Sequence, residues 1–120
     1  MNFSLGKFAD AAAFKADLII LCIGENVPAL KTEEATAKYQ EQVTVLLKTL
    51  KSNPKAAIIV RSSFWANPAK DGAMRKACEA VGGTFVDISA LAKDEQNYAR
   101  SERPYKHAGV ANHPGDRGMA

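Results

Sequence analysis

The chain has 120 residues, of which 47% are hydrophobic and 24% are charged, and its formal net charge is +3. This length suits one domain rather than two, and the weak, evenly spread charge argues against a nucleic-acid partner, because the densest basic patch (Lys48, Lys51 and Lys55) fits a solvated helix end. No apolar run approaches the ~20 residues of a membrane-spanning helix, so we expect no membrane partner either.

The first predicted element in chain order is a strand at residues 17–23, an apolar run that Gly24 ends. A continuous apolar run of this length is typical of a strand buried on both faces of a parallel sheet. A helix is predicted from about Thr32 to Lys51, because its apolar side chains recur at three- and four-residue spacing and form one stripe: Tyr39, Val43, Leu46, Leu47 and Leu50.

Residues 56–60 form a second apolar run and predict a second buried strand. Asn67 and Pro68 then supply a cap and a proline at the first helical position, so a helix is predicted from there to the glycine pair at 82–83. Residues 84–87 predict a third, short strand.

The alternation of strands and helices predicts an α/β fold with a parallel sheet and right-handed crossovers. In open sheets of this kind, ligands bind at the carboxyl ends of the strands. Residues 24–26, residues 61–65 and Asp87 should therefore gather at one edge. The polar segment 94–112 shows little periodicity, and we expect it to be a long surface loop.

Gly24 and Asn26 are the first candidate site residues. A glycine that ends a buried strand permits a tight turn, and an asparagine two residues later can aim its amide into a cleft, where a developing oxyanion needs a donor. The same residue types also suit an ordinary turn, so both interpretations stay open.

His113 is the second candidate. Pro114 after it predicts the start of a helix, with Asp116 in the first turn. The imidazole would then stand just outside a helix N-terminus at the strand-edge cleft, which suits a general base. A structural or merely exposed histidine is the alternative.

Taken together, the Gly-x-Asn block and His-Pro-Gly-Asp-x-Gly-Met resemble the C-terminal portion of SGNH (GDSL-like) hydrolases, most closely their carbohydrate-esterase-like members. The similarity covers about residues 17–120 and includes the stretches IGENV, RSSFWANP and HAGVANHPGDRGM. It implies a three-layer α/β/α sandwich of flavodoxin-like type, of which this chain holds about three strands of a larger parallel sheet.

The resemblance also implies an activity, the hydrolysis of a small-molecule or saccharide ester without a cofactor. By position, His113 matches the catalytic base of the family, Asn26 matches its oxyanion donor, and Gly24 matches the conserved glycine of the same block. The family's glycine from the intervening block has no clear counterpart here.

The family's nucleophilic serine, in a Gly-Asp-Ser-like turn, has no counterpart. Ser4 is the only serine before Gly24, and no predicted strand precedes it, so we do not assign it as the nucleophile. Ser62 and Ser63 end the second strand, but they lack a glycine-flanked turn and are expected to cap loop backbone. We therefore expect residues 1–120 to be a single, truncated hydrolase domain that is inactive alone. A non-catalytic α/β binding module is the alternative.

The partner that orients His113 is a further open point. Many family members carry an aspartate three residues before the histidine, where this chain has Val110. Asp116, Glu25 and Glu102 are candidates, and a backbone carbonyl is the expected acceptor. Phe64 and Trp65 are expected either to line the substrate cleft or to join the core.

No metal or nucleotide site is expected. Cys22 and Cys78 are predicted to be small buried hydrophobes, and no cysteine or carboxylate pair accompanies His107 and His113 at ligand spacing. No glycine-rich phosphate loop follows any predicted strand.

Truncation would leave the strand at 18–23 as a sheet edge, so we expect self-association through that edge. The N-terminal residues lack the basic start and apolar stretch of a signal peptide, and we expect a soluble chain. Secretion or a periplasmic location of the intact protein stays open.

Overall fold

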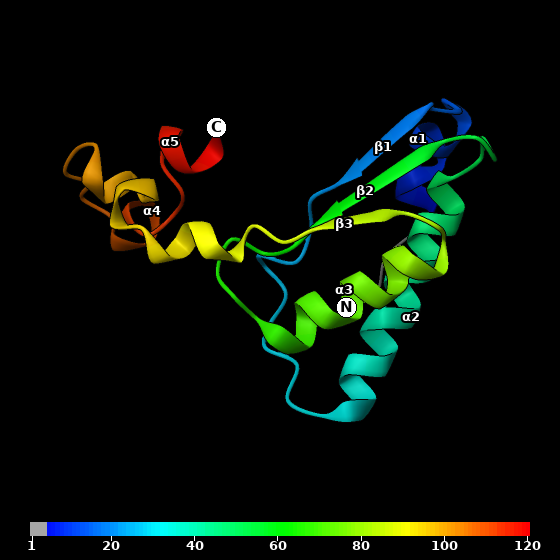
Figure 1. The fold of residues 1–120 in the computed structure, drawn as a ribbon, viewed down its shortest axis with the longest axis horizontal. Coiled ribbons are helices and arrows are strands. Elements are labelled where there is room, and N and C mark those ends of the chain that lie inside the picture. The colour runs from blue at the N-terminus through cyan, green and yellow to red at the C-terminus, as the bar shows by residue number, and fades with distance from the viewer. Residues whose placement is uncertain (1–4) are drawn as a thin grey trace.

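The structure is a computed structural model that describes residues 5–120. Its first part alternates helices and strands (Figure 1): η1 (Leu5–Phe8), α1 (Ala9–Ala13), β1 (Leu18–Leu21), α2 (Glu33–Leu50), β2 (Ala57–Arg61), α3 (Pro68–Ala80) and β3 (Thr84–Val86). Its last part holds short helices only: η2 (Ser89–Lys93), η3 (Glu95–Asn97), η4 (Ala99–Ser101), α4 (Ala108–Ala111) and α5 (Asp116–Met119). No helix among the described residues is both long and apolar enough to cross a membrane.

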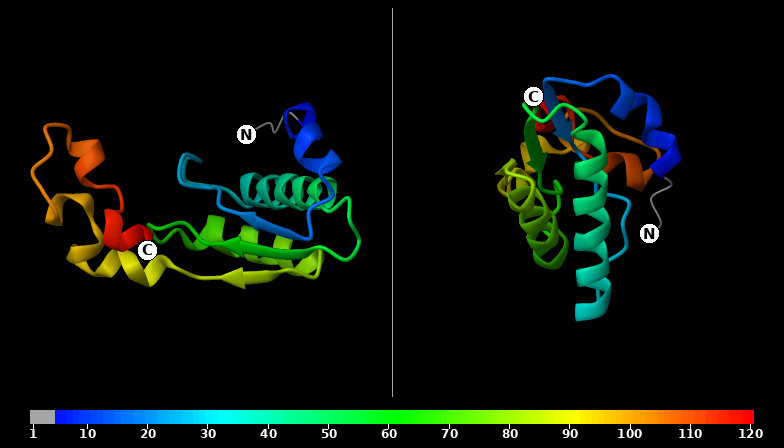
Figure 2. Two further views of the ribbon diagram at one scale, coloured as in Figure 1. Left: turned by 90° about the horizontal axis from the view of Figure 1, so that it is seen from above. Right: turned by 90° about the vertical axis from the view of Figure 1, so that its right-hand side faces the viewer.

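The three strands form one parallel sheet in the order β1-β2-β3, so the predicted α/β class is confirmed. Helices α2 and α3 pack against each other and cover the same face of the sheet (Figure 2). Two right-handed crossovers that proceed in the same direction across a sheet put both helices on one face. Residues 5–120 thus form two layers, and no helical layer covers the other face within them.

The core lies between that sheet face and the two helices. Its fully buried side chains come from two helices and the central strand: Val43, Leu46 and Leu47 of α2, Met74, Ala77 and Cys78 of α3, and Val60 of β2. The apolar stripe predicted along residues 32–51 is therefore the core-facing side of α2.

The prediction that the first strand is buried on both faces is wrong. Leu21 is buried, but Leu18 and Ile20 are 51% and 59% exposed. The reason is the one-sided placement of α2 and α3, which leaves alternate side chains of an apolar strand without a cover. Cys22 is likewise exposed rather than buried, whereas Cys78 is buried as predicted, and both cysteines are free.

The predicted helix ends are confirmed by their caps. Thr32 Oγ1 accepts the Ala35 N–H at 3.0 Å, and Asn67 Oδ1 accepts the Lys70 N–H at 3.2 Å. Gly82, two residues after α3, has a φ of +72°, the left-handed conformation that a helix end favours.

The segment 94–112 is mostly exposed, as predicted for a surface loop, but it also contains short helical turns at Glu95–Asn97, Ala99–Ser101 and Ala108–Ala111. With the residues around it, it forms a C-terminal lobe (residues 88–120) that projects beyond the carboxyl ends of the strands (Figure 1). Within the lobe, Tyr98 pairs with Pro114 in an antiparallel bridge. Short polar turns of this kind carry no helical periodicity in the sequence, which is why pattern analysis missed them.

Candidate functional site

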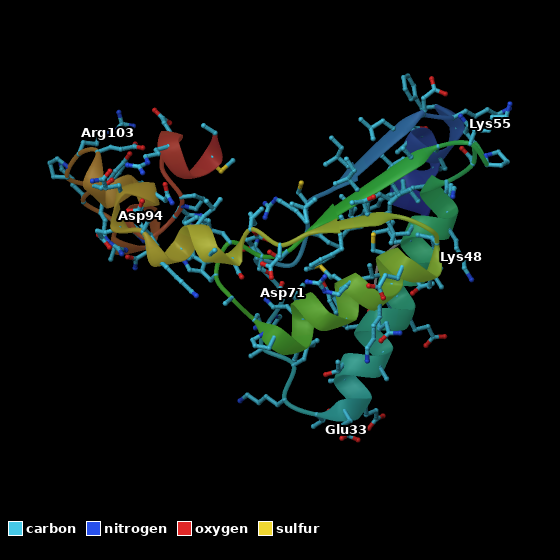
Figure 3. All side chains as sticks on the ribbon, viewed as in Figure 1. Glu33, Lys48, Lys55, Asp71, Asp94 and Arg103 are labelled. Carbon is cyan, nitrogen blue, oxygen red and sulfur yellow. The ribbon has the colours of Figure 1, made fainter. Side chains whose placement is uncertain are left out.

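The three segments predicted to gather at the carboxyl edge of the sheet do so. The Glu25 carboxylate accepts from Arg61 Nη1 at 2.7 Å and from the Phe64 N–H at 3.2 Å, which joins the loop after β1 to the loop after β2. Ser62 Oγ lies 3.2 Å from Asp87 Oδ1, which joins the latter loop to the end of β3. The basic side chains Lys48 and Lys55 lie at the opposite end of the sheet (Figure 3).

Residues Gly24–Val27 form a tight turn, closed by a hydrogen bond from the Val27 N–H to the Gly24 carbonyl at 3.1 Å. Gly24 has a φ of +113°, which side chains other than glycine's rarely tolerate. A Cβ atom there would also meet Ser63 Oγ at 3.3 Å and Met74 Cε at 3.4 Å. Gly24 is therefore required both by its backbone conformation and by the packing beneath it.

Lys70 holds this turn from below. Its side chain is buried, and its Nζ donates to the carbonyl oxygens of Gly24 and Val27, each at 2.7 Å. Lysine is almost never fully buried unless its ammonium is satisfied, and here the two carbonyls at the ends of the turn are its acceptors. The turn is thus fixed to α3.

Asp71, the next residue of α3, fixes the loop after β2 (Figure 3). Its two carboxylate oxygens accept the N–H groups of Ser63 at 3.0 Å and Asn67 at 2.9 Å. Burial, together with the negative charges of Asp71 and Glu25, raises the pKa of Tyr39 to about 12. The Tyr39 hydroxyl is buried and has no hydrogen-bond partner within residues 5–120.

Asn26 stands at the exposed tip of the turn, and its side-chain amide makes no hydrogen bond within the described part of the chain. It lines an open cavity of about 400 Å³, together with Cys22, Ile23, Gly24, Glu25, Val27 and Arg61. The prediction that Gly24 and Asn26 share one cleft at the end of the first strand is consistent with this geometry. The amide is free to donate to a bound molecule.

A second cavity, of about 220 Å³, adjoins the first because both are lined by Glu25 and Arg61. Its other walls are Phe64 and side chains of the C-terminal lobe: Ile88, Leu91, Pro114, Gly118, Met119 and Ala120. The lobe therefore closes one side of the cleft that Asn26 borders on the other.

His113 belongs to the lobe and directly precedes Pro114 of that wall. Its N–H donates to the Val110 carbonyl at 3.1 Å, and its own carbonyl accepts the Ala99 N–H at 2.9 Å. The exposed imidazole contacts the Trp65 ring at a centroid distance of 5.3 Å. It lines neither of the two cavities.

The imidazole of His113 makes no hydrogen bond to any residue from 5 to 120. The expected backbone carbonyl is therefore wrong as its partner, and none of the candidate carboxylates contacts it. Glu25 is engaged by Arg61, and Glu102 accepts the Arg117 N–H at 3.4 Å. Asp116 lies in the first turn of α5, as the sequence predicts, but its carboxylate does not reach the ring.

The described serines do not supply a nucleophile next to His113. The single hydroxyl proton of Ser62 is shared between the Ser63 carbonyl and Asp87 Oδ1, and its Oγ accepts the Ile88 N–H at 2.9 Å, so Ser62 joins the loops as expected. Ser63 Oγ is buried beneath Gly24 and has no partner within residues 5–120. Ser4 lies outside the described residues.

Lys70 and Asp71 are the site residues that sequence reasoning missed. A signal for Lys70 was present, because it falls on the apolar stripe of α3 at helical spacing from Ala73, Met74 and Ala77. A lysine on a core-facing stripe predicts a buried ammonium with specific acceptors. No such pattern marks Asp71, whose partners are backbone N–H groups.

In comparisons with known proteins, no family model, no curated protein and no solved structure matches the chain. Its chemistry is therefore inferred from its own side chains. These provide a free amide donor at a fixed turn, a cleft on the edge of a parallel sheet, and an imidazole on the lobe that borders the cleft.

Proposed function

We propose that this chain supplies the oxyanion donor and the general base of an SGNH-type ester hydrolase that acts on acylated carbohydrate. Asn26 is the donor, His113 is the base, and Gly24 shapes the turn that carries the donor. We do not assign any serine of residues 5–120 as the nucleophile. The free Asn26 amide on a turn anchored by Lys70 is the observation that carries the proposal.

The proposed roles define the chemistry of acyl transfer. His113 takes the proton of the serine hydroxyl as its oxygen attacks the ester carbonyl, and Asn26 Nδ2 donates to the oxyanion that forms. The proton then passes from His113 to the departing alcohol as the ester C–O bond breaks. Water releases the acyl group by the same steps in reverse order. The anchored backbone of the turn supports this role, because a donor held near its working position needs less reorganisation during the reaction.

A non-catalytic binding module is the second candidate, and one observation favours it. The imidazole of His113 has neither a serine nor an acidic partner in the described chain, and Ser62 and Ser63 are both buried. Such a module would use the same cleft, lined by Glu25 and Arg61, to bind a ligand without turnover.

The test is hydrolysis of an activated acetate ester by two proteins, the chain alone and the chain joined to an upstream strand with a Gly-Asp-Ser-like turn. We expect background rates from the first and turnover from the second. His113→Ala and Asn26→Ala should each lower kcat of the joined protein by about 100-fold or more. His107→Ala is the matched control, because His107 caps α4 with its own ring and should not affect the rate.

Two outcomes would contradict the proposal. A folded, joined protein without activity would favour the binding module. Activity of the chain alone that His113→Ala abolishes would mean that it holds its own nucleophile, and Ser62→Ala and Ser63→Ala would then identify it.

A further inference from the structure

The imidazole of His113 is held by a ring rather than by a carboxylate. Trp65, the single tryptophan of the chain, lies with its ring centroid 5.3 Å from that of His113 and with the two planes at 78°. This edge-to-face arrangement is the geometry that aromatic rings prefer. The two residues come from the loop after β2 and from the C-terminal lobe, so the contact links the two halves of the site.

Trp65 is itself fixed in place. Its ring meets Phe64 edge to face at 5.5 Å, and Phe64 in turn meets Tyr98 at 5.3 Å. Phe64 is only 2% exposed, and its N–H donates to Glu25. The four rings therefore form a series that runs from the lobe, across the loop after β2, and back to the lobe at His113.

The backbone of His113 is fixed by its hydrogen bonds to Val110 and Ala99, so only the side-chain torsions of the imidazole remain free. Among the side-chain hydrogen bonds, ion pairs and ring contacts within residues 5–120, the contact with Trp65 is the one that the imidazole makes.

We propose that Trp65 is the positioning residue for His113, with the indole ring restricting the orientation of the imidazole by edge-to-face packing. This inference rests on the proposed role of His113 as the base. Trp65 acts through His113 and is not assigned a contact with substrate.

The experiment is NMR spectroscopy of the histidine rings in the chain as it stands. The chain has two histidines and one tryptophan, so His107→Gln and His113→Gln assign the ring signals without ambiguity. We expect nuclear Overhauser effects between the Trp65 and His113 rings. The order parameter of the His113 ring should be near the value of about 0.85 that marks a rigid backbone.

Trp65→Leu should lower the order parameter of the His113 ring below about 0.6, and Trp65→Phe should retain most of it, since a second aromatic ring can keep the contact. His107 is the internal control, because its Nδ1 accepts the Gly109 N–H at 3.1 Å and should not respond to Trp65. Unchanged His107 signals would also show that the lobe of each variant is folded.

The proposal is overturned if the His113 ring is equally ordered in the wild type and in Trp65→Leu, or if Trp65→Phe is as mobile as Trp65→Leu. In the joined, active protein, Trp65→Leu should lower kcat about 10-fold or more with little change in KM, and Trp65→Phe should restore it. If the joined protein has no activity at all, the proposed function fails, while the ring dynamics still decide whether Trp65 positions His113.

Discussion

The buried ammonium of Lys70 donates to the carbonyl oxygen of Gly24 at 2.7 Å, although the two residues are far apart in the sequence. The same ammonium holds Val27 at 2.7 Å, so both ends of the turn that presents Asn26 rest on one side chain of α3. A catalytic donor is effective only when it is held in its productive geometry before substrate arrives. The Lys70 contacts fix the backbone on both sides of Asn26, the proposed donor, while its side-chain amide makes no hydrogen bond within residues 5–120.

Lys70→Met should destabilise the fold, because methionine fills the space but leaves the carbonyl of Val27 without a donor and the carbonyl of Gly24 with only the Val27 N–H. We expect the free energy of unfolding to fall by about 1–3 kcal/mol, as measured by urea denaturation. Lys76→Met is the matched control, since Lys76 is an exposed lysine of the same helix. Equal losses in the two variants would show that the Lys70 contacts contribute no stability.

Gly24→Ala should also destabilise the fold, because alanine must adopt a φ of +113° and place its Cβ against Ser63 Oγ at 3.3 Å. A loss of about 1–3 kcal/mol is expected in the same denaturation assay. Gly72→Ala provides the opposite control. Gly72 lies inside α3, and an added Cβ would meet no atom within 4 Å beyond the neighbouring backbone of its own helix, so the substitution should stabilise the protein by up to about 1 kcal/mol. A Gly24→Ala variant as stable as Gly72→Ala would contradict the account of the turn.

The parts of the fold that follow local rules were predictable from sequence. The apolar stripe and the cap at Thr32 predict α2 within a residue at each end, and Asn67 with Pro68 predicts the start of α3. The exposure of Ile20 was not predictable, because it depends on which face of the sheet the helices cover. That is a property of the sheet order rather than of the strand's own residues.

The site divides in the same way. Gly24 and Asn26 stand out because turn chemistry is local to the end of a strand. The contacts that fix them cross long sequence separations, from Lys70 to Gly24 and from Glu25 to Phe64. The sequence predicts a carboxylate or a backbone carbonyl as the partner of His113, and it gives no sign of the contact with Trp65, because ring contacts between distant loops have no sequence spacing.

Tyr39 predicts a dependence of stability on high pH. Burial, with the nearby charges of Asp71 and Glu25, raises the pKa of Tyr39 to about 12 from about 10 in an unfolded chain. Between those two values the unfolded state has lost the phenolic proton and the folded state has kept it. The free energy of unfolding therefore falls as the pH rises through this window, and the contribution is fully present below about pH 10.

Tyr39→Phe tests this, because it removes both the titration and a buried hydroxyl that has no partner within residues 5–120. At neutral pH we expect it to be as stable as the wild type or slightly more so. Between about pH 10 and about pH 12 its stability should fall less steeply than that of the wild type. Tyr105→Phe serves as the control, and identical slopes for Tyr39→Phe and the wild type would refute the burial argument.

Self-association through the β1 side of the sheet stays a prediction. The structure shows an exposed apolar surface on that side through which two copies could associate. Phe14, Leu18 and Ile20 are 81%, 51% and 59% exposed, and they line an apolar groove of about 600 Å³ with Phe8 and Leu50. Contiguous exposed apolar surface of this kind favours association, and an edge strand adds unpaired backbone groups.

Ile20→Lys should weaken that association without unfolding the chain, since the lysine would stand on the uncovered face of β1. Sedimentation velocity over a wide range of concentrations should show concentration-dependent species for the wild type and a monomer for the variant. Val45→Lys is the control, because Val45 is a 42% exposed apolar residue of α2 that does not line the groove. A wild type that remains monomeric throughout, or a Val45→Lys variant with the same effect as Ile20→Lys, would exclude the β1 face as the contact. If the wild type stays monomeric, the uncovered sheet face remains exposed to water without association. If Val45→Lys has the same effect as Ile20→Lys, the added charge alone accounts for the change.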